Sequence, residues 1–106
     1  MSNDQSELYD RIFKRDGVKC IYCGFDGTQS IENWMQLTLD HVIPRRFGED
    51  NSDNNLVTCC FSCNILTNHI PNSKAISRDE IIKLKRDHVN QYLKSIQNRW
   101  QTITSK

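Results

Sequence analysis

The chain has 106 residues, of which 37% are hydrophobic and 25% are charged. This length suits one domain with a thin core, so we expect a single domain over residues 1–106. No apolar run reaches the roughly 18 residues that cross a membrane, and residues 1–6 are polar and acidic, unlike a signal peptide. We therefore expect a cytoplasmic protein that does not contact a membrane.

Charge is distributed unevenly along the chain, although the net charge is only +1. Residues 1–70 carry six Lys or Arg and ten Asp or Glu, whereas residues 71–106 carry eight Lys or Arg and three Asp or Glu. The positive charge of the C-terminal third predicts a surface for a polyanion. A basic helix that simply faces solvent gives the same pattern, so charge alone leaves both interpretations open.

In the N-terminal half the sequence predicts one helix and one strand. Residues 6–16 are predicted to form a helix that Ser6 caps. Residues 24–34 have the composition of a loop. Apolar and polar residues then alternate, which predicts a strand over residues 35–43 that Pro44 ends.

Two further elements follow a polar loop over residues 45–55, which is rich in Asn and Asp. Residues 56–59 are short and mostly apolar, which predicts a second strand. A second helix is predicted to begin near Ser62. It must end before Pro71, because proline cannot continue a helix.

The last helix has the clearest pattern. Ser77 and Glu80 form a capping box, and apolar residues at helical spacing predict a helix over residues 77–100. These apolar residues are Ile82, Val89, Tyr92, Leu93, Ile96 and Trp100. We expect this face to pack on the rest of the domain, with a dimer or partner surface as the alternative, and the tail beyond it to be frayed.

Five cysteines are many for a chain of this length. In a secreted protein they would indicate disulfides with one thiol left over, whereas clustered cysteines in a reducing cytosol more often bind metal. The spacing decides between these interpretations, because the sequence holds two Cys-x-x-Cys pairs: Cys20 with Cys23, and Cys60 with Cys63. Four soft ligands at this spacing predict a structural zinc site with no open position. Cys59 is left over, and we expect it to be a small buried residue.

Several polar motifs accompany the cysteines. Asp40-His41-x-x-Pro44 is followed by Asn55-Leu56 and then by Cys63-Asn64. Arg15-Asp16-Gly17 precedes the first Cys-x-x-Cys pair, and each such pair is called a knuckle below. In this combination the sequence resembles the HNH endonuclease family over roughly residues 11–68. The resemblance implies an α+β fold, a small ββα-metal (His-Me finger) domain with a four-cysteine zinc site and flanking N- and C-terminal helices.

The resemblance also implies metal-dependent hydrolysis of DNA by a core over residues 20–70. His41 would act as the general base, since an imidazole titrates near neutral pH. Asp40 and Asn64 offer oxygen ligands suited to Mg²⁺ or Mn²⁺. Asn55 would fix the loop and orient His41 through an amide–imidazole hydrogen bond.

DNA contacts are predicted from basic side chains that follow the first strand or lie on the last helix. They are Arg45, Arg46, Lys83, Lys85 and Arg86. Such contacts set position and not sequence, so we expect nicking or double-strand cleavage with weak intrinsic specificity. The alternatives are a non-catalytic zinc module that binds nucleic acid, a nuclease subunit of a phage packaging or bacterial restriction complex, and a homodimer.

The chain departs from the family pattern after the second knuckle. The family often has a lysine there, where this chain has Thr67. His69 lies nearby in the sequence. It is either a helix-end residue or a substitute metal ligand or phosphate contact.

Overall fold

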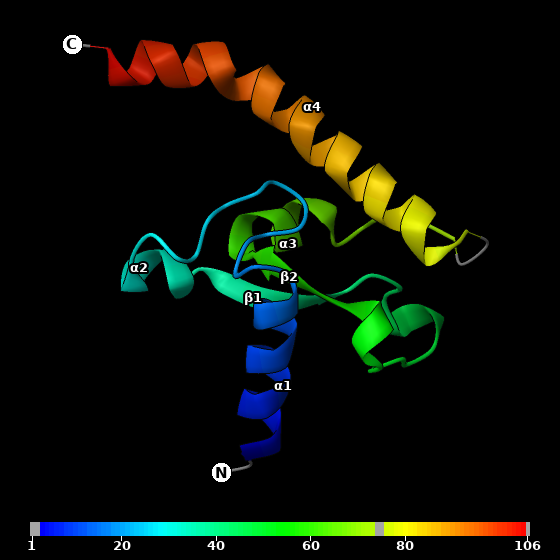
Figure 1. Ribbon diagram of the computed structural model, residues 1–106. Coiled ribbons are helices and arrows are strands. Elements are labelled where there is room, and N and C mark those ends of the chain that lie inside the picture. Colours follow the sequence, from blue (N-terminus) through cyan, green and yellow to red (C-terminus); the bar gives the residue numbers. More distant parts are fainter. Residues whose placement is uncertain (1–2, 74–75, 106) are drawn as a thin grey trace.

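The computed structural model describes residues 3–73 and 76–105, and it combines a two-stranded sheet with helices (Figure 1). The elements in chain order are α1 (Asn3–Arg15), α2 (Ile31–Trp34), β1 (Leu37–His41), two short 3-10 turns (Arg45–Phe47 and Asp53–Asn55), β2 (Leu56–Cys60), α3 (Phe61–Thr67) and α4 (Arg78–Thr104). None of the described helices is long and apolar enough to span a membrane.

β1 and β2 form an antiparallel hairpin in which Asp40 pairs with Val57 and His41 pairs with Leu56. α3 follows β2 directly, because the backbone turns into the helix at Cys60. The two strands and this helix make a ββα unit, with α1 and α4 on opposite sides of the hairpin (Figure 1). The predicted α+β fold class is confirmed.

The core lies where the hairpin meets the helices. Ile12 of α1, Val57 of β2 and Ile81 of α4 are all almost completely buried. Burial of such side chains is the main driving force for a domain of this size. The end of α1 is also tied to β2 by polar contacts, since the Thr58 amide donates to Asp16 Oδ2 at 2.8 Å.

Three elements differ from the sequence-based expectations. α1 begins at Asn3, so Ser6 lies within the helix and is not the N-cap that was predicted. The predicted loop over residues 24–34 contains α2, because Ser30 Oγ caps this short helix by accepting a hydrogen bond from the Asn33 amide at 3.0 Å. The tail expected to fray is instead helical as far as Thr104. A helix can continue without tertiary contacts where it holds neither Gly nor Pro.

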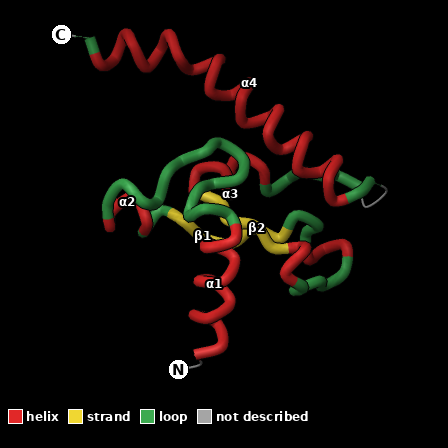
Figure 2. The backbone as a smooth tube through the Cα atoms, in the orientation of Figure 1, coloured by secondary structure: helices red, strands yellow, loops and turns green. Residues whose placement is uncertain are grey.

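The apolar face of α4 packs only in part. Its buried residues are Ile81, Ile82, Lys85 and Val89. Beyond them the helix extends past the body of the domain, as the backbone tube shows (Figure 2). Tyr92, Leu93 and Trp100 are exposed. The prediction that the whole face packs on the domain is therefore wrong for the second half of α4.

Candidate functional site

The first cysteine pair sits on a tight turn that glycine makes possible. The Gly24 amide donates to the Cys20 carbonyl at 2.8 Å, and Gly24 has a φ of +80°, a conformation that a side chain would strain. The Ile21 amide donates to the Thr58 carbonyl at 3.0 Å, so the turn is anchored to β2. This anchoring carries Cys20 and Cys23 toward the end of the same strand.

The second pair uses the start of α3. Cys60 is the N-cap of this helix, and its Sγ accepts a hydrogen bond from the Cys63 amide at 3.5 Å. A cap residue and the residue three positions later lie on the same side of the first turn. Both sulfurs therefore face the first pair.

The four sulfurs of Cys20, Cys23, Cys60 and Cys63 lie within 4.8 Å of one another. Cys23 Sγ is 3.8 Å from Cys60 Sγ, which matches the separation of about 3.8 Å that Zn–S bonds of about 2.3 Å give in a tetrahedron. The donor set thus fits a structural Zn²⁺. Cys59 is completely buried in the core and outside the cluster, as predicted.

Asp40 is held by two partners on one oxygen. The Tyr22 hydroxyl and the Lys85 ammonium each donate to Asp40 Oδ2 at 2.7 Å. Neither bond uses Oδ1. Burial, together with the adjacent Asp40 carboxylate, raises the pKa of Tyr22 well above its ordinary value, so the phenol remains a donor.

Lys85 is 1% exposed, and its ion pair with Asp40 spans 45 positions of the chain. The prediction that Lys85 contacts DNA from an exposed helix face is therefore corrected. The sequence did hold a signal for burial, because Ile82, Lys85 and Val89 follow the i, i+3, i+7 spacing of one helix face. Sequence reasoning missed this residue because it treated all the lysines of the helix as solvent-facing.

An open pocket of about 340 Å³ brings together three of the four residues predicted to be catalytic, and Asn55 is not among the residues that line it. Asp40, His41 and Asn64 all line it. Successive strand residues point to opposite faces, yet His41 is the last residue of β1, so both neighbours can border a pocket at the strand end. The pocket is also lined by Leu39, Pro44, Arg45, Arg46, Asn68, Ile70 and Lys85.

The orientation of His41 depends on a residue that sequence reasoning missed. His41 Nε2 lies 2.8 Å from Asn51 Oδ1. An amide oxygen can only accept, so Nε2 carries the hydrogen and Nδ1 is the nitrogen able to take up a proton. Asn51 belongs to the polar loop between the strands. The sequence shows it only as one of several Asn residues in that loop, so nothing distinguishes it as a partner of His41.

Asn55 fixes the loop by bonding to its backbone. It is buried, its amide nitrogen donates to the Ile43 and Asp50 carbonyls at 3.1 and 2.8 Å, and its Oδ1 accepts from the Ile43 amide at 2.8 Å. The expected hydrogen bond from Asn55 to His41 is therefore corrected, since the side-chain amide is fully used by the loop.

The remaining predicted DNA contacts are exposed. Arg45 lies 4.0 Å from Glu49 in a solvent-exposed ion pair, and Arg46 donates to the Asn68 carbonyl at 3.2 Å and also to the Pro71 carbonyl. On α4, Lys83 faces solvent and Arg86 donates to the Ile21 carbonyl at 2.9 Å. Only the two arginines of the 3-10 turn border the pocket.

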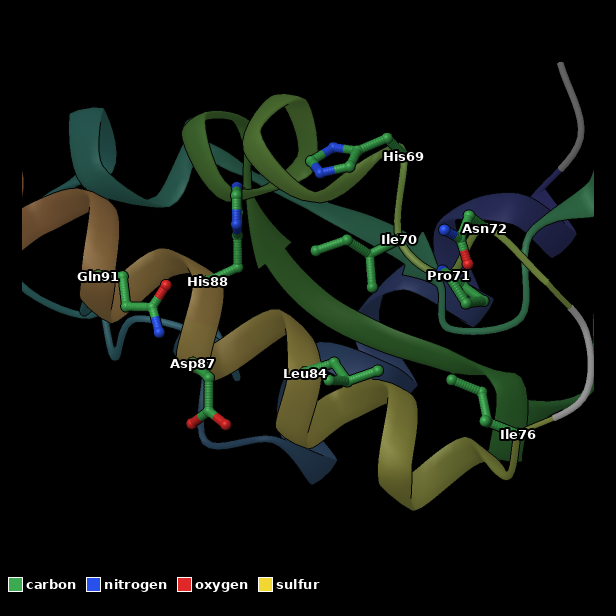
Figure 3. A pocket seen from close by; sticks show the side chains of 9 residues that line it. All are labelled: His69, Ile70, Pro71, Asn72, Ile76, Leu84, Asp87, His88 and Gln91. Atoms are coloured by element: carbon green, nitrogen blue, oxygen red, sulfur yellow. The ribbon is translucent and has the colours of Figure 1, made fainter.

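His69 lines a different pocket, of about 440 Å³, between the chain after α3 and the first half of α4 (Figure 3). Its ring meets the ring of His88 edge to face, with centroids 5.1 Å apart. Ile70 and Leu84 border the same hollow (Figure 3). His69 is thus not among the residues that line the pocket with Asp40 and His41.

Comparison with known proteins agrees with this geometry. The family model described as HNH endonuclease matches residues 20–69, a segment that holds both knuckles, the hairpin and α3. No curated protein and no solved structure matches the chain. The family match shows an HNH endonuclease segment over residues 20–69. The four-cysteine cluster and the small α+β fold are consistent with a zinc-bearing ββα-metal domain.

Proposed function

We propose that the protein is a metal-dependent endonuclease that hydrolyses DNA phosphodiester bonds in the pocket at the end of β1. The observation that carries this proposal is the convergence of Asp40, His41 and Asn64 on one pocket, from a strand and from a helix. The family match supports a nuclease-type function. We further propose that residues 1–106 act as one nuclease domain.

The charge around the pocket suits a phosphate. Arg45 and Arg46 line it, and the one acidic side chain of the lining, Asp40, is paired with Lys85. The N-terminal two thirds of the sequence is acidic, so a phosphate would be repelled from most of this region. Cations gathered at the pocket reverse this effect locally and would raise the concentration of a polyanion there.

His41 is the proposed general base. In the tautomer that Asn51 sets, Nδ1 accepts the proton of the attacking water while Nε2 stays bonded to Asn51 Oδ1. The same contact fixes the orientation of the ring while the proton is transferred. Asn51 is thus a positioning residue for His41.

Asp40 and Asn64 would hold a Mg²⁺ or Mn²⁺ ion, with Oδ1 of Asp40 as the carboxylate ligand. When bound, such an ion polarises the scissile phosphate and stabilises the charge that develops on the leaving oxygen. Two protein oxygens are few, but Mg²⁺ commonly relies on one or two carboxylates together with waters and substrate phosphates. We therefore expect weak metal affinity in the absence of DNA.

Lys85 and Tyr22 would prepare Asp40 for this role. Their bonds to Oδ2 fix the orientation of the carboxylate and leave Oδ1 without a bond to either group. Four cysteines around Zn²⁺ would brace the turn that carries Tyr22 against the start of the helix that carries Asn64. The zinc is structural in this proposal, since the cysteines fill its shell.

Arg45, Arg46, Lys83 and Arg86 are the proposed DNA contacts, and Lys85 is no longer one of them. Contacts to phosphate set position and carry no sequence information, so we expect weak sequence specificity. A silent zinc module that binds DNA without cutting it is the second candidate, and it would bind without needing His41.

Plasmid cleavage in Mg²⁺ or Mn²⁺ tests the proposal. We expect His41→Ala to lower the cleavage rate about 10²-fold or more, the usual contribution of a general base, with DNA binding unchanged. Asn51→Ala should cause a smaller loss and shift the pH profile of the rate, because it removes the partner of Nε2. Asn54→Ala, a substitution at an exposed residue of the same loop, is the matched control and should cleave normally.

Two results would reject the proposal. Cleavage that survives His41→Ala would remove His41 from the mechanism. DNA binding without cleavage by the unmodified protein, in either metal, would favour the silent binding module.

A further inference from the structure

The second half of α4 presents an apolar stripe that the described residues 3–73 and 76–105 leave uncovered. Tyr92, Trp100 and Ile103 are 42%, 59% and 70% exposed, and with Ile96 they recur at helical spacing on one side of the helix. Together with Arg99 they border a shallow hollow of about 220 Å³. Residues 90–104 extend about 22 Å at 1.5 Å per residue, so this stripe reaches well beyond the body of the domain.

A second apolar surface lies at the other side of the molecule, between α1 and α2. This groove has a volume of about 430 Å³, and its lining includes Tyr9, Phe13, Trp34 and Met35. Trp34 and Met35 are 47% and 59% exposed. The charged residue that lines the groove is Asp10.

The two surfaces are complementary in charge as well as in apolar character. Residues 88–105 contain Lys94 and Arg99 but neither Asp nor Glu. The cation that borders the α4 hollow is Arg99, and the anion that borders the groove is Asp10. An apolar helix face flanked by a cation fits an apolar groove flanked by an anion.

The contact cannot form within one chain, because α1 and α4 lie on opposite sides of the hairpin (Figure 1) and α4 is a continuous helix. Pairing the second half of α4 with that of another copy would also bury the stripe, but it would place Arg99 of both copies near one another without an anion from residues 88–105. Binding of this half to DNA would use Arg99 and Lys94 but leave the apolar stripe in water. A second copy of the chain therefore fits both surfaces best.

We propose that the second half of α4 docks into the α1–α2 groove of a second copy of this chain. If each copy inserts its helix into the other, the arrangement closes as a two-fold dimer and the two contacts add their buried areas. Stable interfaces bury more than about 1,000 Å² in total, so the doubled contact matters. This proposal goes beyond the proposed nuclease function and stands on surfaces outside its pocket.

Native mass as a function of concentration tests the proposal on the full chain. We expect a concentration-dependent dimer, measured by sedimentation velocity and light scattering. Trp100→Glu on the stripe and Met35→Glu in the groove should each weaken the dimer at least ten-fold. Asn98→Glu adds the same charge on the opposite side of the helix and should leave the dimer unchanged.

One mixture and one charge swap sharpen the result. Trp100→Glu and Met35→Glu protein, mixed together, should form a heterodimer more readily than either variant forms a homodimer, because one of its two contacts joins an intact stripe to an intact groove. Arg99→Asp and Asp10→Arg should each weaken the dimer, and the double variant should restore it. Circular dichroism would verify that these surface variants remain folded.

A protein that stays monomeric at all concentrations would overturn the proposal. So would a dimer that Trp100→Glu disrupts but Met35→Glu does not, because that result indicates α4 pairing with α4. Loss of DNA retention in the stripe variants with no change in mass would instead assign the stripe to DNA. None of these outcomes depends on cleavage activity.

Discussion

The two halves of α4 both carry apolar residues at helical spacing, but only the first half buries them. Over Arg78–Val89 the helix packs on the body of the domain and buries Ile81, Ile82 and Lys85. Over Asn90–Thr104 a comparable set of apolar side chains faces solvent. Both halves are helical, so helix propensity cannot be what separates them. Burial in α4 therefore depends on whether the body of the domain lies against that half of the helix.

The first half of α4 contributes to the candidate active site, because it supplies a partner to one of the site's residues. Lys85 comes from outside the segment that the family model matches, yet it donates to Asp40 inside that segment. An ammonium group is rarely buried unless it is paired. α4 thus completes a site that the ββα unit alone would leave with an unpaired buried carboxylate.

The largest expected effect comes from removing the proposed zinc, which would brace α3 beneath the first half of α4. Structural zinc sites contribute on the order of 10 kcal/mol to folding, so strong chelation should unfold the domain. By hydrogen exchange at protein concentrations too low for association, amides of residues 78–89 should lose protection, whereas those of residues 90–104 have little to lose. Adding Zn²⁺ back should restore the protection.

Metal analysis of two cysteine variants provides the control. Cys63→Ser should lose about one tightly held zinc ion per chain, since it removes one of four ligands. Cys59→Ser should retain the ion, because Cys59 lies outside the cluster. A stable, zinc-free fold of the unmodified protein would contradict the zinc site.

The next largest effect is expected at the buried ion pair. Lys85→Met should lower the free energy of unfolding by about 3–5 kcal/mol, because it leaves Asp40 buried without its charge partner. The matched Lys83→Met, at an exposed position of the same half, should change stability by no more than about 0.5 kcal/mol. Urea unfolding measures both.

A double variant separates the ion pair from simple packing. Asp40→Asn combined with Lys85→Met removes both charges and should cost less than the sum of the single changes. Additive effects would show that Lys85 and Asp40 are not energetically coupled. Equal effects of Lys85→Met and Lys83→Met would abolish the distinction between buried and exposed positions.

The smallest effects compare apolar side chains in the two halves. Ile81→Ala should cost about 2–5 kcal/mol, since it creates a cavity beside residues of the core. Leu93→Ala, at a position 45% exposed, should cost less than about 1 kcal/mol when measured at protein concentrations too low for association. Thermal unfolding of both variants checks the difference, and similar losses would mean that the second half packs in solution.

The sequence by itself determined the local features of this protein. The two Cys-x-x-Cys spacings predicted the cluster, because two intervening residues let one turn present both sulfurs. The period-2 pattern ending at Pro44 predicted β1, and the capping box at Ser77 predicted the start of α4. The motif around Asp40 and His41 identified the family that the comparison then confirmed.

Only the tertiary structure decided which polar groups meet. Asn51, ten positions after His41, bonds to its ring, and Lys85 reaches Asp40 from 45 positions away. Sequence patterns describe one helix face or one turn at a time, whereas these pairs depend on how loops and helices dock. The same physical reason explains α4, where local spacing predicted an apolar face and only docking decided which half of it is buried.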